Sequence, residues 1–176
     1  MALYDDIYEV AANNYGLITS FEAKKMGISY KELSRLAADG RLTRLGYGVY
    51  RIKHHVPTPH DIFAEAVALV GPGAYLFGGS VIALHGLAPT NPARITVATP
   101  FRVRKALPSP IKVIHSKNVS NVTHYEGIPS QNIVEAIRAS RNTIMTERLE
   151  DAVKNARING LITEIEEATL LEEFYI

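Results

Sequence analysis

The chain has 176 residues, of which 47% are hydrophobic, and a formal net charge of +1 at neutral pH, so it can hold one medium domain or two small ones. The absence of cysteine excludes a disulfide framework and a thiolate metal site. No apolar run is long enough to span a bilayer, and the N-terminus lacks the basic and apolar regions of a signal peptide, so we expect a cytoplasmic protein without membrane contacts.

The N-terminal segment predicts a helix followed by a short strand. The helix is expected from Tyr4 to Asn14, with Ile7, Val10 and Ala11 on its inward face. Leu17-Ile18 is expected to form a short strand that pairs with a later hairpin.

Two capping boxes follow in close succession. In Thr19 with Glu22, and again in Ser29 with Glu32, the hydroxyl can accept a first-turn N–H while the glutamate reaches back to the N–H of the cap residue. Glycines follow both segments, as expected where a helix ends in a left-handed residue. These patterns predict helices at about Ser20–Met26 and Tyr30–Asp39, joined by a turn at Gly27–Ile28.

The second of these helices has two different faces. Leu33, Leu36 and Ala37 share one face at helical spacing and should pack inward. The opposite face and its flanks carry the residues Tyr30, Lys31, Ser34, Arg35 and Ala38.

A glycine-containing hairpin comes next, with strands at Leu42–Leu45 and Val49–Ile52 and a turn at Gly46-Tyr47-Gly48. From Ser20 to Lys53 there are eight lysines and arginines against three acids. Two helices and a basic hairpin in this order predict a winged helix-turn-helix whose exposed helix enters the major groove of DNA. Two alternatives stay open: a purely structural helical hairpin with a solvated basic face, and a winged helix that binds protein.

A proline-containing segment, His54–Pro59, predicts a linker. We therefore expect an α+β protein with two domains. Residues 1–56 would form the winged helix-turn-helix, and residues 57–176 a mixed α/β domain with a small sheet and C-terminal helices. Its expected helices are Asp61–Val70, Val81–Gly86, Ile133–Ala139, a helix from about Met145 to Gly160 and a last one ending at Phe174. Its expected strands are Arg94–Thr99, Ile111–His115 and Val122–Tyr125.

Charge is unevenly distributed within this second domain. No carboxylate side chain occurs between Glu65 and Glu126, whereas Arg94–Lys117 contains six basic residues. From Glu126 onward there are ten acids and five bases. The basic stretch is expected to extend a DNA footprint or to meet an acidic partner.

The glycine turn Gly78-Gly79-Ser80 is similar to the helix opening that holds a triphosphate in nucleotidyltransferase-fold proteins. Those enzymes carry an Asp-x-Asp strand soon afterwards, and this chain has Arg94–Thr99 there instead. Without carboxylates nothing would hold magnesium, so we expect a structural turn, with a degenerate nucleotidyltransferase fold as the alternative.

No other pattern predicts catalysis or ligand binding. Ser80 is not in a nucleophile elbow, the six histidines show no metal-ligand spacing, and the predicted strands carry no acid that a nuclease would need. We therefore predict no enzyme activity, no catalytic residue, no metal site and no cofactor.

The run from Gly16-Leu-Ile-Thr-Ser through Leu-Ser-Arg-Leu-Ala-Ala-Asp-Gly-Arg-Leu-Thr-Arg-Leu-Gly-Tyr-Gly-Val-Tyr resembles the N-terminal winged helix of the AbiEi family. These proteins are antitoxins of abortive-infection, type IV toxin–antitoxin systems. The resemblance covers about Tyr4–Ile52. It implies a DNA-binding repressor of its own operon that recognises promoter inverted repeats, and a C-terminal domain that opposes a nucleotidyltransferase-like toxin.

With this resemblance, double-stranded promoter DNA and a cognate toxin are the expected partners, and a winged-helix adaptor between proteins is the alternative. The expected DNA-contacting residues are Ser29, Tyr30, Lys31, Ser34, Arg35, Arg41, Arg44, Tyr47 and Arg51.

Overall fold

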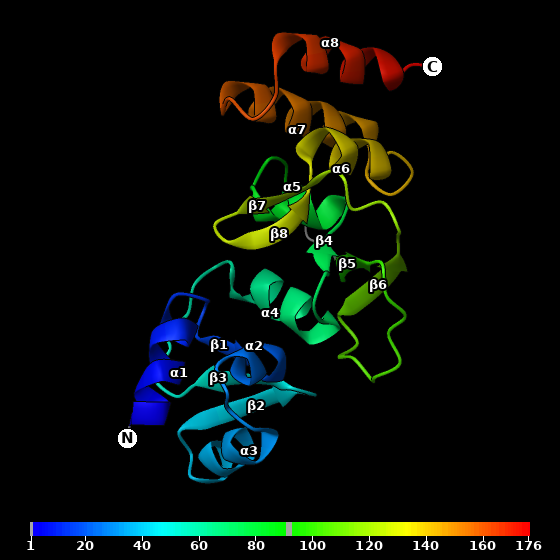
Figure 1. The fold of residues 1–176 in the computed structure, drawn as a ribbon. Coiled ribbons are helices and arrows are strands. Elements are labelled where there is room, and N and C mark those ends of the chain that lie inside the picture. Colours follow the sequence, from blue (N-terminus) through cyan, green and yellow to red (C-terminus); the bar gives the residue numbers. More distant parts are fainter. Residues whose placement is uncertain (1, 91–92) are drawn as a thin grey trace. The chain divides into compact units, whose positions relative to one another are not determined.

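The computed structural model describes residues 2–90 and 93–176, which fall into two compact units (Figure 1). The first unit comprises the chain up to Pro72 together with Val103–Leu107, and the second comprises Gly73–Arg102 and Pro108–Ile176. Among the described residues, no helix is long and apolar enough to cross a membrane.

The first unit has the helix and strand order of a winged helix-turn-helix, as predicted. A short antiparallel sheet has the strand order β1-β3-β2. Its elements are α1 (Ala2–Ala12), β1 (Leu17–Thr19), α2 (Ser20–Lys25), α3 (Tyr30–Ala38), β2 (Leu42–Gly46), β3 (Val49–Ile52) and α4 (Asp61–Val70).

One face of this sheet packs against α1, α2 and α3. Tyr50 and Ile52 of β3 belong to the same buried cluster as Ile7 of α1 and Leu33 of α3. Val10, which was predicted to face inward, is instead 37% exposed. The buried face of α1 is formed without Val10, by Ile7 and Ala11, which lie four residues apart on one side of the helix.

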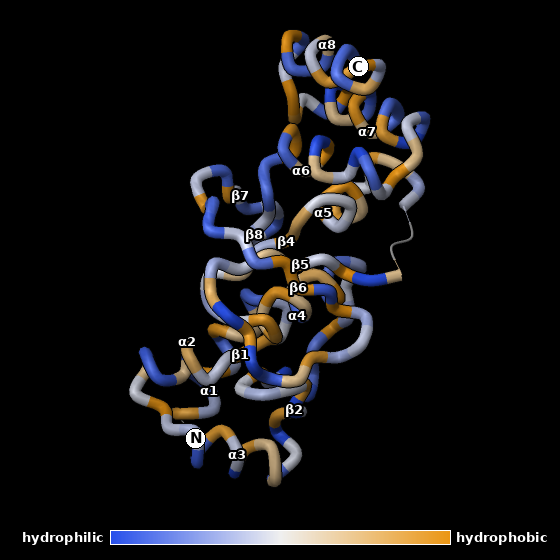
Figure 2. Tube along the Cα trace, turned by 90° about the vertical axis from the view of Figure 1, so that its right-hand side faces the viewer, coloured by the Kyte–Doolittle hydropathy of each residue, from blue (hydrophilic) through white to orange (hydrophobic). Residues whose placement is uncertain are grey.

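The other face of the sheet is covered by α4. Arg51 of β3 forms an ion pair with Glu65 of α4 at 3.0 Å, and the Leu69 side chain lies so close to Gly46 that a Cβ there would be 2.5 Å from it. Figure 2 shows α4 as a largely hydrophobic segment. The boundary predicted between residues 56 and 57 therefore falls inside the first compact unit.

The predicted linker is fixed in place by side-chain contacts. His55 Nε2 lies 2.7 Å from Asp61 Oδ2, and the Thr58 hydroxyl donates to Asp61 Oδ1 at 2.6 Å. The His55 ring also packs against Gly16, where any Cβ would meet it at 2.6 Å. These contacts connect the end of the sheet to the start of α4.

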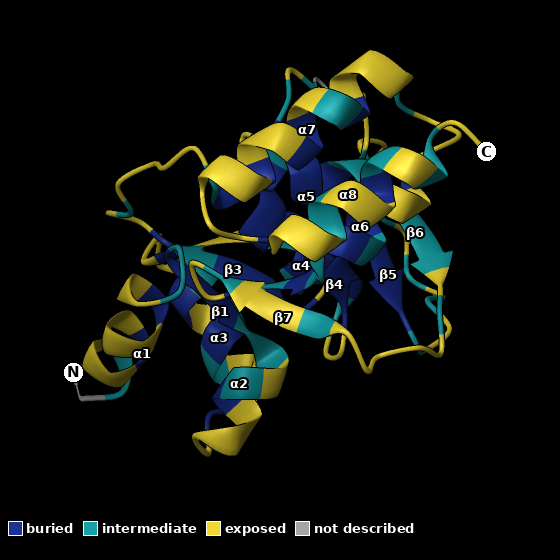
Figure 3. Cartoon of the chain, turned by 90° about the horizontal axis from the view of Figure 1, so that it is seen from above, coloured by how far each residue is buried: buried dark blue, intermediate teal, exposed yellow. Residues whose placement is uncertain are grey.

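The second unit contains a sheet of mixed direction with the strand order β6-β5-β4-β8-β7. Figure 3 shows the central strands β4 and β5 as buried and the edge strand β7 as more exposed. Its elements are β4 (Tyr75–Leu76), α5 (Gly79–Leu84), β5 (Ile95–Thr99), β6 (Ile111–His115), β7 (Val122–Tyr125), β8 (Ile128–Gln131), α6 (Ile133–Ala139), α7 (Thr146–Ile158) and α8 (Glu164–Glu173).

Strand β8 was missed by the sequence prediction. It pairs antiparallel with β7 and parallel with β4, so it joins the edge hairpin to the centre of the sheet. The connecting turn, Glu126-Gly127, has positive φ at both residues, which is the geometry of a tight hairpin turn.

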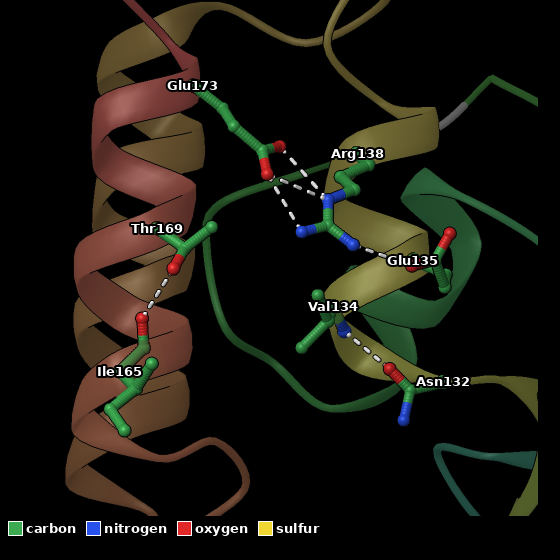
Figure 4. A network of polar contacts seen from close by, with 7 residues as sticks. All are labelled: Asn132, Val134, Glu135, Arg138, Ile165, Thr169 and Glu173. Carbon is green, nitrogen blue, oxygen red and sulfur yellow. Dashed lines mark hydrogen bonds and ion pairs between the residues drawn. The ribbon is translucent and has the colours of Figure 1, made fainter.

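A polar network attaches the last helix to α6 (Figure 4). The Arg138 guanidinium donates to Glu173 of α8 through Nε and Nη2 and to Glu135 through Nη1. These hydrogen bonds from Arg138 lower the pKa of Glu173, although burial opposes the shift. Leu170 of α8 is fully buried, so apolar packing and an ion cluster together hold this helix.

Candidate nucleic-acid interface

Helix α3 is positioned by its N-terminal cap and by the turn that precedes it. The Ser29 hydroxyl accepts from Glu32 N–H at 3.3 Å, and Ser29 N–H donates to Glu32 Oε2 at 2.7 Å, so the predicted capping box is present. Hydrogen bonds from Ser29 lower the pKa of Glu32, with a smaller contribution from Arg35. Gly27 has a φ of +77°, and the next residue, Ile28, is buried and anchors the turn in the core.

The outward face of α3 carries the predicted polar and basic residues. Tyr30 is 51% exposed, Lys31 and Arg35 are exposed, and Ser34 is half-buried. Within the described part of the chain, neither Lys31 nor Arg35 forms an ion pair. Their charges therefore remain available to a ligand, while the Ser29 hydroxyl is already occupied by the cap.

The β2–β3 wing is short. Strand β3 pairs with β2 along its whole length and with β1 through Val49–Arg51, so only Tyr47 and Gly48 extend past the sheet. Tyr47 is 68% exposed at this tip. Gly48 has a φ of +68°, and its carbonyl accepts from Ser20 N–H at 2.8 Å, which places the tip beside the start of α2.

Arg41 and Arg44 both lie exposed on the segment that leads into the wing. The Arg41 guanidinium lies 5.2 Å from the centre of the Tyr4 ring on α1. Arg44 Nε donates to the Gly46 carbonyl at 3.3 Å. Each contact orients its guanidinium without neutralising its charge.

Arg51 differs from the other predicted contacts. Its side chain is only 19% exposed and is committed to Glu65. Two of its nitrogens, Nε and Nη2, are buried and have no hydrogen-bond partner among the described residues. We therefore leave Arg51 out of the proposed DNA contacts, because reaching a phosphate would require it to break the ion pair with α4.

A cation from the basic stretch Arg94–Lys117 lies next to the wing, in a contact that local sequence patterns did not predict. Lys105 Nζ is 5.9 Å from the centre of the Tyr47 ring. The two residues are far apart in the chain, so neither helical nor strand periodicity could connect them.

The Gly78-Gly79-Ser80 turn in the second unit has structural contacts. The buried Ser80 hydroxyl accepts from Thr96 N–H at 2.8 Å, and Gly78 N–H donates to Gln131 Oε1 at 3.0 Å. A Cβ on Gly79 would lie 3.1 Å from Ile144. The turn is therefore packed against its own unit. In the described ranges, no group of three or more metal-ligating side chains could hold an ion.

A three-stranded sheet, an exposed second helix of a helix-turn-helix and a short β-hairpin define the winged helix-turn-helix class. Residues 5–53 match the family described as "Transcriptional regulator, AbiEi antitoxin". The N-terminal segment therefore carries an AbiEi-type winged helix, which confirms the resemblance predicted for it.

Two further comparisons add little. A search of curated proteins found no match. Among solved structures, the crystal structure of the RV2827C protein from Mycobacterium tuberculosis is similar over 98% of this chain and 81% of that chain, at 13% identity and a TM-score of 0.42.

Proposed function

We propose that this protein is a cytoplasmic DNA-binding repressor and antitoxin of an abortive-infection-type toxin–antitoxin operon. It binds inverted repeats in its own promoter and opposes a nucleotidyltransferase-like toxin. It has no enzyme activity of its own. The observation that carries the proposal is the open, basic face of α3 within a segment that matches the AbiEi antitoxin regulators.

The electrostatics of the first unit support DNA as the ligand. Glu22 and Glu32 are engaged in capping boxes, and Glu65 is paired with Arg51. Such partners are absent, among the described residues, for Lys31, Arg35, Arg41 and Arg44. This arrangement leaves positive charge unneutralised on the surface that a winged helix presents to duplex phosphates.

In this proposal, helix α3 contacts the major groove through Tyr30, Lys31, Ser34 and Arg35. Around the wing, Arg41 and Arg44 contact the backbone and Tyr47 lies at the tip. Ser29 contributes by fixing the helix start, because its hydroxyl is bonded to Glu32.

A mobility shift with the duplex upstream of the gene tests this proposal. The wild-type protein should retard it, and Arg35→Ala should weaken binding about tenfold or more, as expected when a side chain that binds a base or a phosphate is removed. Arg148→Ala, which removes an exposed arginine from the second unit, serves as the matched control and should bind like wild type. No shift with the wild-type protein, or equally weakened binding in both variants, would contradict a DNA-binding role for α3.

A protein-binding adaptor is the main alternative. It would leave the promoter duplex unshifted while the exposed α3 face remained necessary for capture of a partner protein. The same mobility shift separates the two functions, because only the repressor retards free DNA.

The proposed antitoxin function is tested by co-expression in cells. Co-expression with a nucleotidyltransferase-like gene adjacent in the operon should relieve the growth arrest that this gene causes alone. If the Arg35→Ala variant also relieves the growth arrest, the surface that opposes the toxin lies outside the exposed face of α3. Persistent arrest with wild-type protein would remove the antitoxin assignment and leave only the regulator.

A degenerate nucleotidyltransferase fold is disfavoured by the contacts of Ser80 and Gly78, which occupy the groups that would face a triphosphate. Incubation with labelled nucleotide and magnesium should give no transfer product, and nucleotide should leave the unfolding temperature unchanged. A stabilising shift would favour the degenerate fold instead.

A further inference from the structure

Residues Val103–Leu107 cluster with the first compact unit, although the residues on both sides of them belong to the second. Within this segment, Lys105 approaches the wing tip, and its Nζ lies 5.9 Å from the centre of the Tyr47 ring. It also lies beside Gly71 at the end of α4, where a Cβ would be 3.7 Å from Nζ. The segment therefore brings a lysine to a turn that is otherwise built from β2 and β3.

The Lys105 ammonium has no anionic partner among the described residues. Burial lowers the pKa of Lys105 below its usual value, so the side chain has lost part of its water. The C-terminal end of α4 and the face of the Tyr47 ring both favour a cation at this position. They orient the ammonium, and neither supplies a carboxylate to pair with it.

The surface next to Lys105 and the wing tip also combines exposed aromatic rings with basic side chains. The wing tip adjoins the start of α2 through the bond from Ser20 N–H to the Gly48 carbonyl. On α2, Phe21 is 48% exposed and Lys25 Nζ lies 4.4 Å from the centre of its ring. Arg104, next to Lys105, is exposed. Aromatic rings alternating with unpaired cations suit the phosphates and sugars of nucleic acid better than an acidic peptide, which would not need the rings.

We propose that Lys105 is a further DNA-contacting residue, which together with Tyr47 forms a second phosphate-binding point at the wing tip. This inference rests on the proposed function and deepens it: the DNA-binding surface is completed by a segment outside residues 5–53. The wing tip itself, Tyr47-Gly48, carries no basic residue, and Val103–Leu107 supplies one.

The test measures binding of the full-length chain to a mixed-sequence duplex at several salt concentrations by fluorescence anisotropy. Lys105→Ala should weaken binding and reduce the slope of log affinity against log salt by about one, the value for one phosphate that is no longer neutralised. Lys105→Arg keeps the charge and should restore the wild-type slope. Lys154→Ala, which removes an exposed lysine from α7 in the second unit, is the matched control and should leave the slope unchanged.

The outcomes separate this inference from the proposed function. If wild type binds and Arg35→Ala weakens binding, but Lys105→Ala keeps the wild-type slope, only the role of Lys105 is overturned. Equal slope changes in the Lys105 and Lys154 variants would also overturn it, because they would indicate a general charge effect. If wild type does not bind duplex DNA, both the proposed function and this inference fail. A thermal unfolding midpoint of Lys105→Ala close to wild type verifies that its weaker binding does not come from unfolding.

Discussion

Arg35 and Arg51 belong to the same basic stretch of sequence, but the fold gives them different surroundings. Arg35 lies exposed on α3, whereas Arg51 is half-buried against Glu65 of α4. Counting charges over residues 20–53 does not distinguish the two arginines, and both were predicted to contact DNA. The structure separates them, because an ion pair shielded from water is costly to break and an exposed guanidinium is free to bind phosphate.

This difference predicts that two substitutions change the stability of the fold to different extents. Arg51→Ala should lower the free energy of unfolding by about 1–3 kcal/mol, since it leaves Glu65 without its hydrogen-bonded partner. Arg35→Ala should change the same quantity by less than about 0.5 kcal/mol, as expected for an exposed helix position. Urea denaturation of both variants measures these values. Comparable destabilisation by the two would mean that the Arg51–Glu65 pair does not hold α4 to the sheet.

Local patterns predicted some residues correctly and could not predict others. The capping boxes at Thr19 and Ser29 are both present, because each depends only on residues three apart in sequence. The partner of Arg51 lies on another element, beyond the predicted boundary. The contact between Lys105 and Tyr47 likewise depends on the tertiary fold.

At the scale of elements, the most consequential difference from the prediction concerns His54–Pro59. Its prolines indicated a linker, but His55, Thr58 and Asp61 form a hydrogen-bonded cluster there. Proline restricts the backbone and does not by itself make it mobile. Strand β8 was missed for a related reason: it is short, contains Pro129 and is recognisable mainly through its pairing with β4 and β7.

The His55–Asp61 cluster predicts a pH-dependent contribution to stability. Burial raises the pKa of Asp61, but hydrogen bonds from Thr58 and His55 outweigh it, and the net shift is downward. A carboxyl with a lowered folded-state pKa stabilises the fold above its unfolded value of about 4, and this contribution is lost as pH falls through the folded pKa. Asp61→Asn should therefore lower the free energy of unfolding by about 1–3 kcal/mol at neutral pH.

The measurement is denaturation of wild type and Asp61→Asn from neutral to acidic pH. The stability difference should shrink as pH falls below about 4, where Asp61 becomes protonated in wild type as well. Asp39→Asn, at an exposed position after α3, is the control and should be nearly neutral at every pH. A difference between wild type and Asp61→Asn that is independent of pH would indicate that the carboxylate charge plays no part.

At the scale of the whole molecule, α4 changes where the DNA-binding unit ends. Leu17 and Val49 are buried, and neither belongs to the core cluster on the α1–α3 side of the sheet. Helix α4 packs on the opposite side of the sheet, and a fragment that stops at residue 56 lacks it. An apolar sheet face left open to water costs stability in proportion to its area.

We therefore expect residues 1–72 to unfold cooperatively as an isolated fragment and residues 1–56 to unfold at a lower temperature or to lack a cooperative transition. Circular dichroism melts of the two fragments compare them directly. Equal melting temperatures would show that α4 is dispensable and would favour the boundary predicted at residues 56 and 57.

The charge of the molecule is separated along the chain although its total is close to zero. Residues 20–53 carry eight bases against three acids, and residues 126–176 carry ten acids against five bases. The small net charge of the whole chain therefore gives no sign of the basic segment at residues 20–53. A test of DNA binding has to change charges within that segment.

The most direct measurement of the central claim is the salt dependence of promoter-duplex binding by wild type and by the triple variant Lys31→Ala, Arg35→Ala, Arg44→Ala. We predict that the wild-type affinity falls steeply with salt. The slope of log affinity against log salt should become shallower by about 2–3 in the variant, because each removed cation leaves one phosphate with its counterions. Identical slopes for the two proteins, with the variant still folded, would contradict a DNA interface formed by α3 and the wing.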